Sequence, residues 1–193
     1  MDTTKKQIRK ITGLAILIAL TIILQLLAGF IKIGPVEINL GLIPIIFAAF
    51  LYGPIEGMLV GIVNGMLVLV NPGTAAFLGL NVVATIVTCI TKTGLAGLVS
   101  GFVYKAFKKH HEFIGSVVSS VVVPIINTSI FFICCLIFFL PLFGESTEQA
   151  LTTIVSTIFA VNTLIEIISI SILSPAIYRV LLIVKKRIFK EEQ

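Results

Sequence analysis

The sequence predicts an all-α, polytopic membrane protein with six transmembrane helices and both termini in the cytoplasm. Composition is the first observation behind this prediction. Of 193 residues, 58% are hydrophobic and only 12% are charged, whereas soluble domains carry about 25% charged residues. Length is the second, because about 20 apolar residues cross a bilayer and this chain supplies roughly six such segments. We expect residues 1–193 to form a single integral-membrane domain.

The first predicted helix follows a basic amino end. Lys5, Lys6, Arg9 and Lys10 precede an uncharged apolar run over residues 11–31. This run is longer than the core of a signal peptide and ends without a small-x-small cleavage site. It is therefore expected to remain in the protein as a membrane helix.

The second and third helices are predicted as a tight hairpin. A polar stretch, residues 32–39, leads into two short apolar segments over residues 38–52 and 55–70. Gly53 and Pro54 lie between the segments. Glycine commonly ends a helix, and proline is favoured in the first turn of the next.

Three longer runs predict the remaining helices. They cover residues 77–107, 113–140 and 150–184. The last is longer than a crossing requires, so we expect a kink near Pro175 and a basic end that projects into water.

The basic residues orient these helices. Twelve of the fourteen Lys and Arg residues lie at the amino end, at the carboxyl end or between the predicted fourth and fifth helices. Only Lys32 falls on the opposite side, and Lys92 lies within a span. This positive-inside pattern predicts a multi-pass protein of the cell membrane with cytoplasmic termini. His110 and His111 belong to the basic loop, where a solvated role is expected.

Several function classes lack their sequence signature. There is no Gly-x-x-x-x-Gly-Lys-Ser/Thr loop, so ATP hydrolysis must come from a partner. The basic clusters alternate with apolar runs and do not form a nucleic-acid surface. Cys89, Cys134 and Cys135 lie in apolar runs without a Cys-x-x-Cys pattern, which favours a hydrophobic role over a metal site. We expect no cofactor in this chain.

Three helices carry small residues at every fourth position, namely Ala15 and Ala19, then Gly57, Gly61 and Gly65, and then Gly97 and Gly101. Such seams let helix backbones approach closely in lipid. The glycine seams are expected inside the bundle. For Ala15 and Ala19 two interpretations stay open, an internal seam or a docking surface for another membrane protein.

A polar stripe marks the fourth helix. Asn81, Thr85, Thr88 and Lys92 fall at i, i+4, i+7 and i+11, within about 60° of arc. Lys92 would lie roughly 20 Å from the external end of the helix, near the middle of the bilayer. A charge at that depth costs about 2.5–3.5 kcal/mol, so it should face a cavity or a partner.

Two further helices carry polar groups at a similar depth. The fifth helix carries Asn127 and Thr128, and the sixth carries Asn162, Glu166 and Ser169. These groups predict a pocket walled by helices four, five and six. Lys92 and Glu166 could neutralise each other as a structural ion pair. We favour a ligand contact for at least one of them, because the surrounding amides and hydroxyls exceed what one pair needs.

Two other polar residues receive structural interpretations. Glu56 lies in the first turn of the third helix, where a carboxylate meets the positive end of the helix dipole. Gln25 in the first helix is expected to form an internal hydrogen bond.

Several segments resemble the substrate-binding S components of energy-coupling factor (ECF) vitamin transporters. Residues 14–20, Leu-Ala-Ile-Leu-Ile-Ala-Leu, look like that family's Ala-x-x-x-Ala motif on helix one. The other matching segments are residues 38–44, residues 51–57 with Leu-Tyr-Gly-Pro, Asn127-Thr128, and residues 162–166. The resemblance covers nearly the whole chain.

The resemblance implies a mode of action. Ala15 and Ala19 would dock on a transmembrane T component, which joins two cytoplasmic ATPase subunits that use the ATP. The loop with Lys32, Glu37 and Asn39 would gate an outward pocket. The S component would then topple in the membrane to release a vitamin inside.

Within the family, the chain most resembles the pantothenate type, in which a basic side chain on helix four and an asparagine on helix five are expected to hold the substrate. Lys92 and Asn127 match these positions, with lysine where arginine is expected. Lysine offers a point charge rather than a bidentate fork. The predicted substrate-binding residues are Asn81, Thr85, Thr88, Lys92, Asn127, Thr128, Asn162 and Glu166.

Other functions stay open at this point. The ligand could be another vitamin, such as riboflavin, folate or cobalamin. An autonomous small transporter is a further alternative, although no inverted repeat is evident. An intramembrane enzyme is disfavoured, because no Asp lies within an apolar run and both histidines lie in the basic loop.

Overall fold

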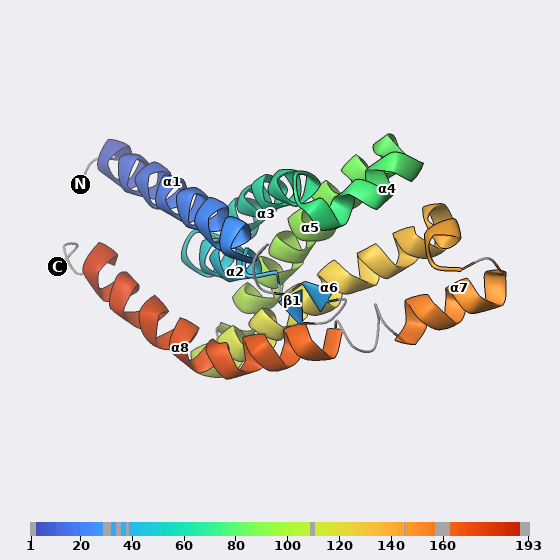
Figure 1. Ribbon diagram of the computed structural model, residues 1–193. Coiled ribbons are helices and arrows are strands. Elements are labelled where there is room, and N and C mark those ends of the chain that lie inside the picture. Colours follow the sequence, from blue (N-terminus) through green and yellow to red (C-terminus); the bar gives the residue numbers. More distant parts are fainter. Residues whose placement is uncertain are drawn as a thin grey trace.

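The computed structural model describes residues 3–28, 32–33, 36–37, 39–108, 111–144, 146–156 and 163–189. These residues are helical apart from one short antiparallel ladder (Figure 1). The elements are α1 (Thr3–Ala28), β1 (Lys32–Ile33), β2 (Val36–Glu37), α2 (Leu42–Leu51), α3 (Pro54–Leu69), η1 (Pro72–Thr74), α4 (Ala75–Leu80), α5 (Val82–Lys108), α6 (Glu112–Phe138), η2 (Leu140–Leu142), α7 (Thr147–Thr153) and α8 (Thr163–Phe189).

Four of the described helices are long and apolar enough to cross a membrane, namely Gln7–Ala28 of α1, α5, α6 and Thr163–Val184 of α8. A fifth span results if α3 and the segment Pro72–Leu80, bent by 76°, count as one. Helix α2 has ten residues and is about 15 Å long, half the thickness of the hydrocarbon layer. The all-helical, multi-pass architecture is confirmed, whereas the predicted count of six spans is not.

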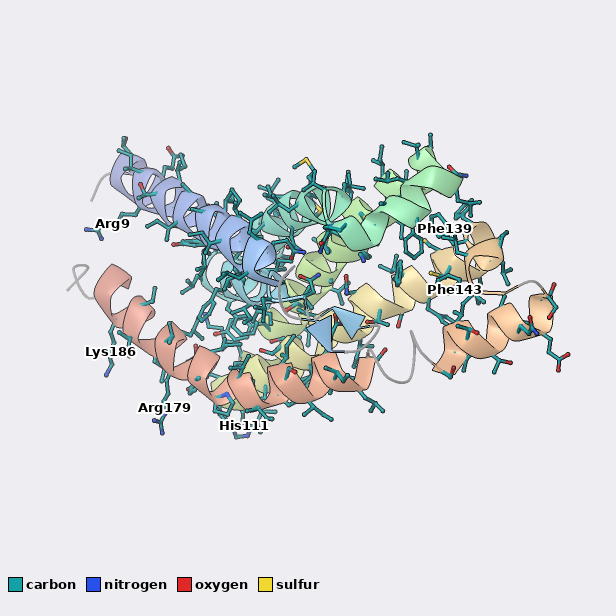
Figure 2. All side chains as sticks on the ribbon, in the orientation of Figure 1. Arg9, His111, Phe139, Phe143, Arg179 and Lys186 are labelled. Atoms are coloured by element: carbon teal, nitrogen blue, oxygen red, sulfur yellow. The ribbon has the colours of Figure 1, made fainter. Side chains whose placement is uncertain are left out.

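Charge is distributed unevenly along the molecule. The amino end of α1 and the carboxyl end of α8 lie at the same end in Figure 1. Arg9, Arg179 and Lys186 project there, while Phe139 and Phe143 lie at the opposite end (Figure 2). This arrangement agrees with termini on one side of the membrane, and their cytoplasmic location stays a prediction.

Helices α3 and α5 pack through their glycine seams. A Cβ atom added to Gly57 would lie 2.8 Å from the carbonyl oxygen of Gly97, and one added to Gly101 would lie 2.8 Å from the backbone nitrogen of Pro54. Cβ atoms on Gly61 and Gly65 would likewise run into the backbone of α5. The prediction that the glycine seams lie inside the bundle is confirmed.

The α2–α3 hairpin also forms as predicted. Helix α2 ends at Leu51 and α3 begins at Pro54. Gly53 between them has φ of 126°, the one positive φ among the described residues. Glu56 in the first turn of α3 forms an ion pair with Lys10 of α1, so this carboxylate joins two helices in addition to facing the helix dipole.

Helix α2 occupies the centre of the bundle. It contacts α1, α3, α5, α6 and α8, and Ile45, Ile46 and Ala48 are fully buried. Phe50 near its end stacks on Tyr104 of α5, with 4.3 Å between ring centroids. An apolar helix of this length is stable here because protein covers it on every side.

Two predicted helices are divided differently. The predicted helix over residues 77–107 is interrupted at Asn81, where the backbone is extended with ψ of 99°. The predicted helix over residues 150–184 is described as α7 and α8, with residues 157–162 outside the described part. Pro175 lies inside α8, and the ribbon bends along this helix (Figure 1), as the sequence predicts.

Candidate functional site

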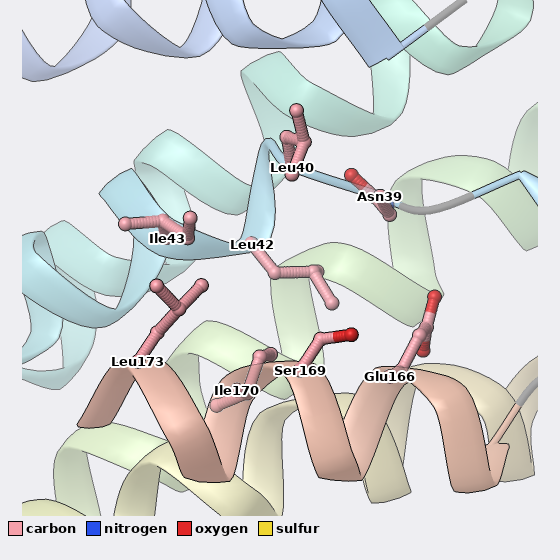
Figure 3. A pocket seen from close by; sticks show the side chains of 8 residues that line it. All are labelled: Asn39, Leu40, Leu42, Ile43, Glu166, Ser169, Ile170 and Leu173. Atoms are coloured by element: carbon pink, nitrogen blue, oxygen red, sulfur yellow. The ribbon is translucent and has the colours of Figure 1, made fainter. Parts of the chain in front are cut away.

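A small cavity lies between α8 and the segment that enters α2. Its lining residues are Asn39, Leu40, Leu42 and Ile43 on one wall and Glu166, Ser169, Ile170 and Leu173 of α8 on the other (Figure 3). Its volume, measured over the positions open to the centre of a water molecule, is about 20 Å³. That is enough for about one water molecule and far below the several hundred Å³ of a small-molecule site.

Glu166 is the charged residue of this cavity. It lies in the first turn of α8 and is 3% exposed. The hydroxyl of Thr128 on α6 donates to its Oε2 atom over 3.2 Å, and the neighbouring Asn127 also interacts with the carboxylate. The structure thus brings together three predicted site residues from two helices that are distant in sequence.

Lys92 and Glu166 interact electrostatically but are not in direct contact. The Lys92 ammonium lies 4.4 Å from the centroid of the Phe131 ring on α6, a cation–π distance. No ion pair within 4.0 Å joins Lys92 and Glu166, both of which are described. The structural ion pair considered from the sequence is therefore absent in this conformation.

Asn81 and Thr85 have a structural role that the sequence analysis missed. The Asn81 Oδ1 atom accepts from the backbone N–H of Ala84 over 3.0 Å, and its carbonyl accepts from the Thr85 hydroxyl over 2.7 Å. Asn81 is exposed and caps the start of α5, as asparagine commonly does. Neither residue lines the cavity at Glu166, and their predicted contact with a ligand stays a prediction.

Several buried polar atoms have no hydrogen-bond partner in the described part of the chain. Two belong to predicted site residues, the Thr88 hydroxyl and the Asn127 Oδ1 atom. Others are Oδ1 of Asn39, Oγ1 of Thr163, Oε1 of Gln25 and both amide atoms of Asn64. Such groups cost about 1–3 kcal/mol each when unsatisfied. A bound polar group that pairs with them would therefore stabilise the protein.

Asn64 was not identified from the sequence, and the internal hydrogen bond expected for Gln25 is not formed by its Oε1 atom. The available signal was an amide inside the apolar, glycine-rich segment 57–65. Asn64 directly precedes Gly65 of the glycine seam, but helical periodicity indicates no partner for its side chain.

The predicted gating loop is described in part. Lys32 and Glu37 are paired positions of the β1–β2 ladder, and their side chains lie outside the described part. Asn39 lines the cavity opposite Glu166 (Figure 3). Asn162 lies among the residues that the structure does not describe.

Ala15 and Ala19 are exposed on α1. This helix packs against α2 and α3 through a face that buries Leu17, Thr21 and Gln25. The alternative of a seam inside this chain's own bundle is therefore wrong. Docking on another membrane protein stays a prediction.

The comparisons with known proteins agree with this architecture. A family model described as "ECF transporter, substrate-specific component" matches residues 9–178. No curated protein and no solved structure gave a significant match. Because the matched region covers most of the sequence, the chain belongs to the family of substrate-specific components of ECF transporters, which are membrane transporter subunits rather than enzymes.

Proposed function

We propose that this protein binds a small anionic vitamin, with pantothenate as the first candidate, and delivers it through an ECF complex. The observation that supports this proposal is the convergence of buried polar groups around two charged residues that form no direct ion pair with each other. Thr128 and Asn127 face Glu166, while Lys92 forms no ion pair with that carboxylate. A ligand placed between them would satisfy groups that the protein leaves open.

The two charges suit different ends of such a ligand. The Lys92 ammonium complements a carboxylate as a point charge. Glu166 accepts hydrogen bonds, so it complements hydroxyl or amide donors. Pantothenate carries a carboxylate at one end and hydroxyl and amide groups along its length, which matches this polarity.

The cavity must open before a vitamin can enter. At about 20 Å³ this cavity is too small for a vitamin, and Asn39, Leu40, Leu42 and Ile43 form one of its two walls. These residues continue the predicted gating loop, so outward movement of the loop would enlarge the cavity.

The transport step would depend on partners. The exposed Ala15 and Ala19 form a flat strip on α1 on which a helix of the T component would pack closely. Two ATPase subunits bound to the T component would supply the energy, and this chain would contribute the ligand site.

Another vitamin is the alternative. It is favoured because Glu166, and not Lys92, lines the described cavity. Riboflavin and folate carry ring N–H donors that would complement a carboxylate, and cobalamin carries amide donors. The same family and mode of transport would apply.

Mass spectrometry of the ligand carried through a mild purification tests the proposal. We expect pantothenate at close to one molecule per protein, displaced by added pantothenate and not by a vitamin without a carboxylate. Recovery of a different vitamin would replace the ligand assignment. Protein that retains and binds no vitamin would contradict the proposed function.

A further inference from the structure

A pair of buried amides lies outside the cavity at Glu166. Gln25 of α1 is 7% exposed and Asn64 of α3 is fully buried. The Oε1 atom of Gln25 and both polar side-chain atoms of Asn64 lack a hydrogen-bond partner in the described part of the chain. Unpaired amides are costly inside a protein, and no water from the lipid side can satisfy them. Their presence therefore points to a group that pairs with them in another state.

Both amides meet the chain at Gly41, directly before α2. A Cβ atom on Gly41 would lie 2.9 Å from the Gln25 Oε1 atom and 2.9 Å from the Asn64 Cγ atom. The Gly41 backbone has φ of −64° and ψ of −14°, which any residue adopts. The position thus requires glycine for space, because the amides pack against the backbone itself.

The residues that flank Gly41 belong to a wall of the cavity at Glu166. Leu40 and Leu42 line the cavity at Glu166, together with Asn39 (Figure 3). One segment of backbone, residues 39–43, therefore contacts both the amide pair at Gly41 and the cavity at Glu166. A cavity of about 20 Å³ holds no vitamin, so a ligand that enters here would displace this segment, and the displacement would join the two polar regions.

We propose that Gln25 and Asn64 form a second part of the ligand site, which binds an uncharged amide or hydroxyl group of the ligand once residues 39–43 have moved. This inference rests on the proposed function as a vitamin-binding S component. Carboxamides offer donors and acceptors without charge, so they complement a neutral group that has both. The charged end of the ligand remains with Lys92, and the site extends from α5, α6 and α8 onto α1 and α3.

Thermal unfolding of the purified protein in detergent tests the inference, with and without pantothenate as the probe. Asn64→Leu keeps the branched shape of the side chain and replaces the unpaired amide with methyl groups, and Gln25→Met likewise replaces the amide on α1 with an unbranched apolar side chain. For each variant we expect the Tm without ligand to rise by about 2–4 °C, and the stabilisation by pantothenate seen in the wild type to be lost. If Asn64→Leu does not accumulate, Gln25→Met provides the same readout.

Two results would overturn the inference. One is a lower Tm without ligand in both single variants, together with a double variant whose loss of stability differs strongly from the sum of the two single losses. The amides would then be hydrogen-bonded to each other or to a fixed water. The other is an unchanged pantothenate-induced shift in both variants. A wild-type protein whose Tm responds to none of pantothenate, riboflavin, folate and cobalamin contradicts the proposed function itself, and the inference falls with it. Failure of the proposed function is measured on the wild-type protein alone, whereas failure of the inference is measured on the variants, so the two failures are distinguishable.

Discussion

Glu166 illustrates how much of the site depends on single hydrogen bonds. Its carboxylate is almost fully buried, and a buried carboxylate is tolerated only with donors around it. Thr128 is the described hydroxyl that donates to it. Removing that donor leaves the buried Glu166 carboxylate with one hydrogen bond fewer, and little water reaches it to replace the bond.

Thr128→Val is therefore expected to destabilise the protein by about 1–3 kcal/mol, a fall in Tm of several degrees. Thr163→Val is the matched control, because the Thr163 hydroxyl has no partner, and its Tm should stay level or rise. Thermal unfolding in detergent measures both variants. Equal Tm values for the two would show that the Thr128 hydrogen bond contributes nothing.

The Lys92 ammonium is expected to bind the ligand carboxylate. Lys92→Met should weaken pantothenate binding by about 10-fold or more, since a hydrogen bond to a charged group contributes about 1.5–3 kcal/mol. Lys92→Arg keeps the charge and should retain most of the affinity. Equilibrium binding with labelled pantothenate measures the difference. Equal affinity for the Met variant and the wild type would exclude a contact between Lys92 and the carboxylate.

At the scale of elements, the α3–α5 contact stabilises the bundle because glycines let the two helix backbones approach closely. Gly61 faces the backbone of Thr93 and Gly94, so the helices approach more closely than any larger residue permits. The sequence showed this seam because a four-residue repeat of glycine has few other uses in an apolar helix.

Gly61→Ala is expected to destabilise the protein by about 1–3 kcal/mol, because the new methyl group overpacks against the α5 backbone. Gly79→Ala on α4 is the control, since nothing lies within 4 Å of a Cβ atom there. The helix propensity of alanine should leave the control unchanged or more stable by about 0.4–1 kcal/mol. If both variants unfold at the same temperature, the close contact between α3 and α5 is not important for stability.

The division of elements was less predictable than their existence. Asn81 ends one helix and caps the next, although the apolar run continues through it. Asparagine can either join a polar stripe or cap a helix, and only the backbone conformation separates the two. Thr85 also bonds locally, because its hydroxyl donates to the Asn81 carbonyl.

At the scale of the whole molecule, α1 presents an uncovered strip to its surroundings. Its other face packs on α2 and α3, and the Lys10–Glu56 ion pair joins its amino end to α3. A helix held in this way keeps Ala15 and Ala19 pointing outward, where a partner helix can reach them.

Ala15→Trp and Ala19→Trp are expected to abolish co-purification with a T component and its two ATPase subunits, because an indole ring blocks close helix approach. Leu27→Trp is the matched control, since Leu27 is exposed on the same helix about 120° around it from Ala15. Affinity purification measures assembly, and pantothenate binding by the isolated chain should persist in all three variants. Full assembly of both alanine variants would contradict docking through this strip.

The sequence by itself determined the membrane location, the helical class, the α2–α3 hairpin and the glycine seams. Each of these follows from composition or from spacing within one segment, and such local signals survive whatever the rest of the chain does. The tertiary structure decided how each helix is rotated and which groups meet across helices. It placed α2 at the centre, paired Thr128 with Glu166, left Lys92 and Glu166 without a direct ion pair, and brought Gln25 and Asn64 together at Gly41. These contacts join residues tens of positions apart, so no periodicity within one helix can specify them.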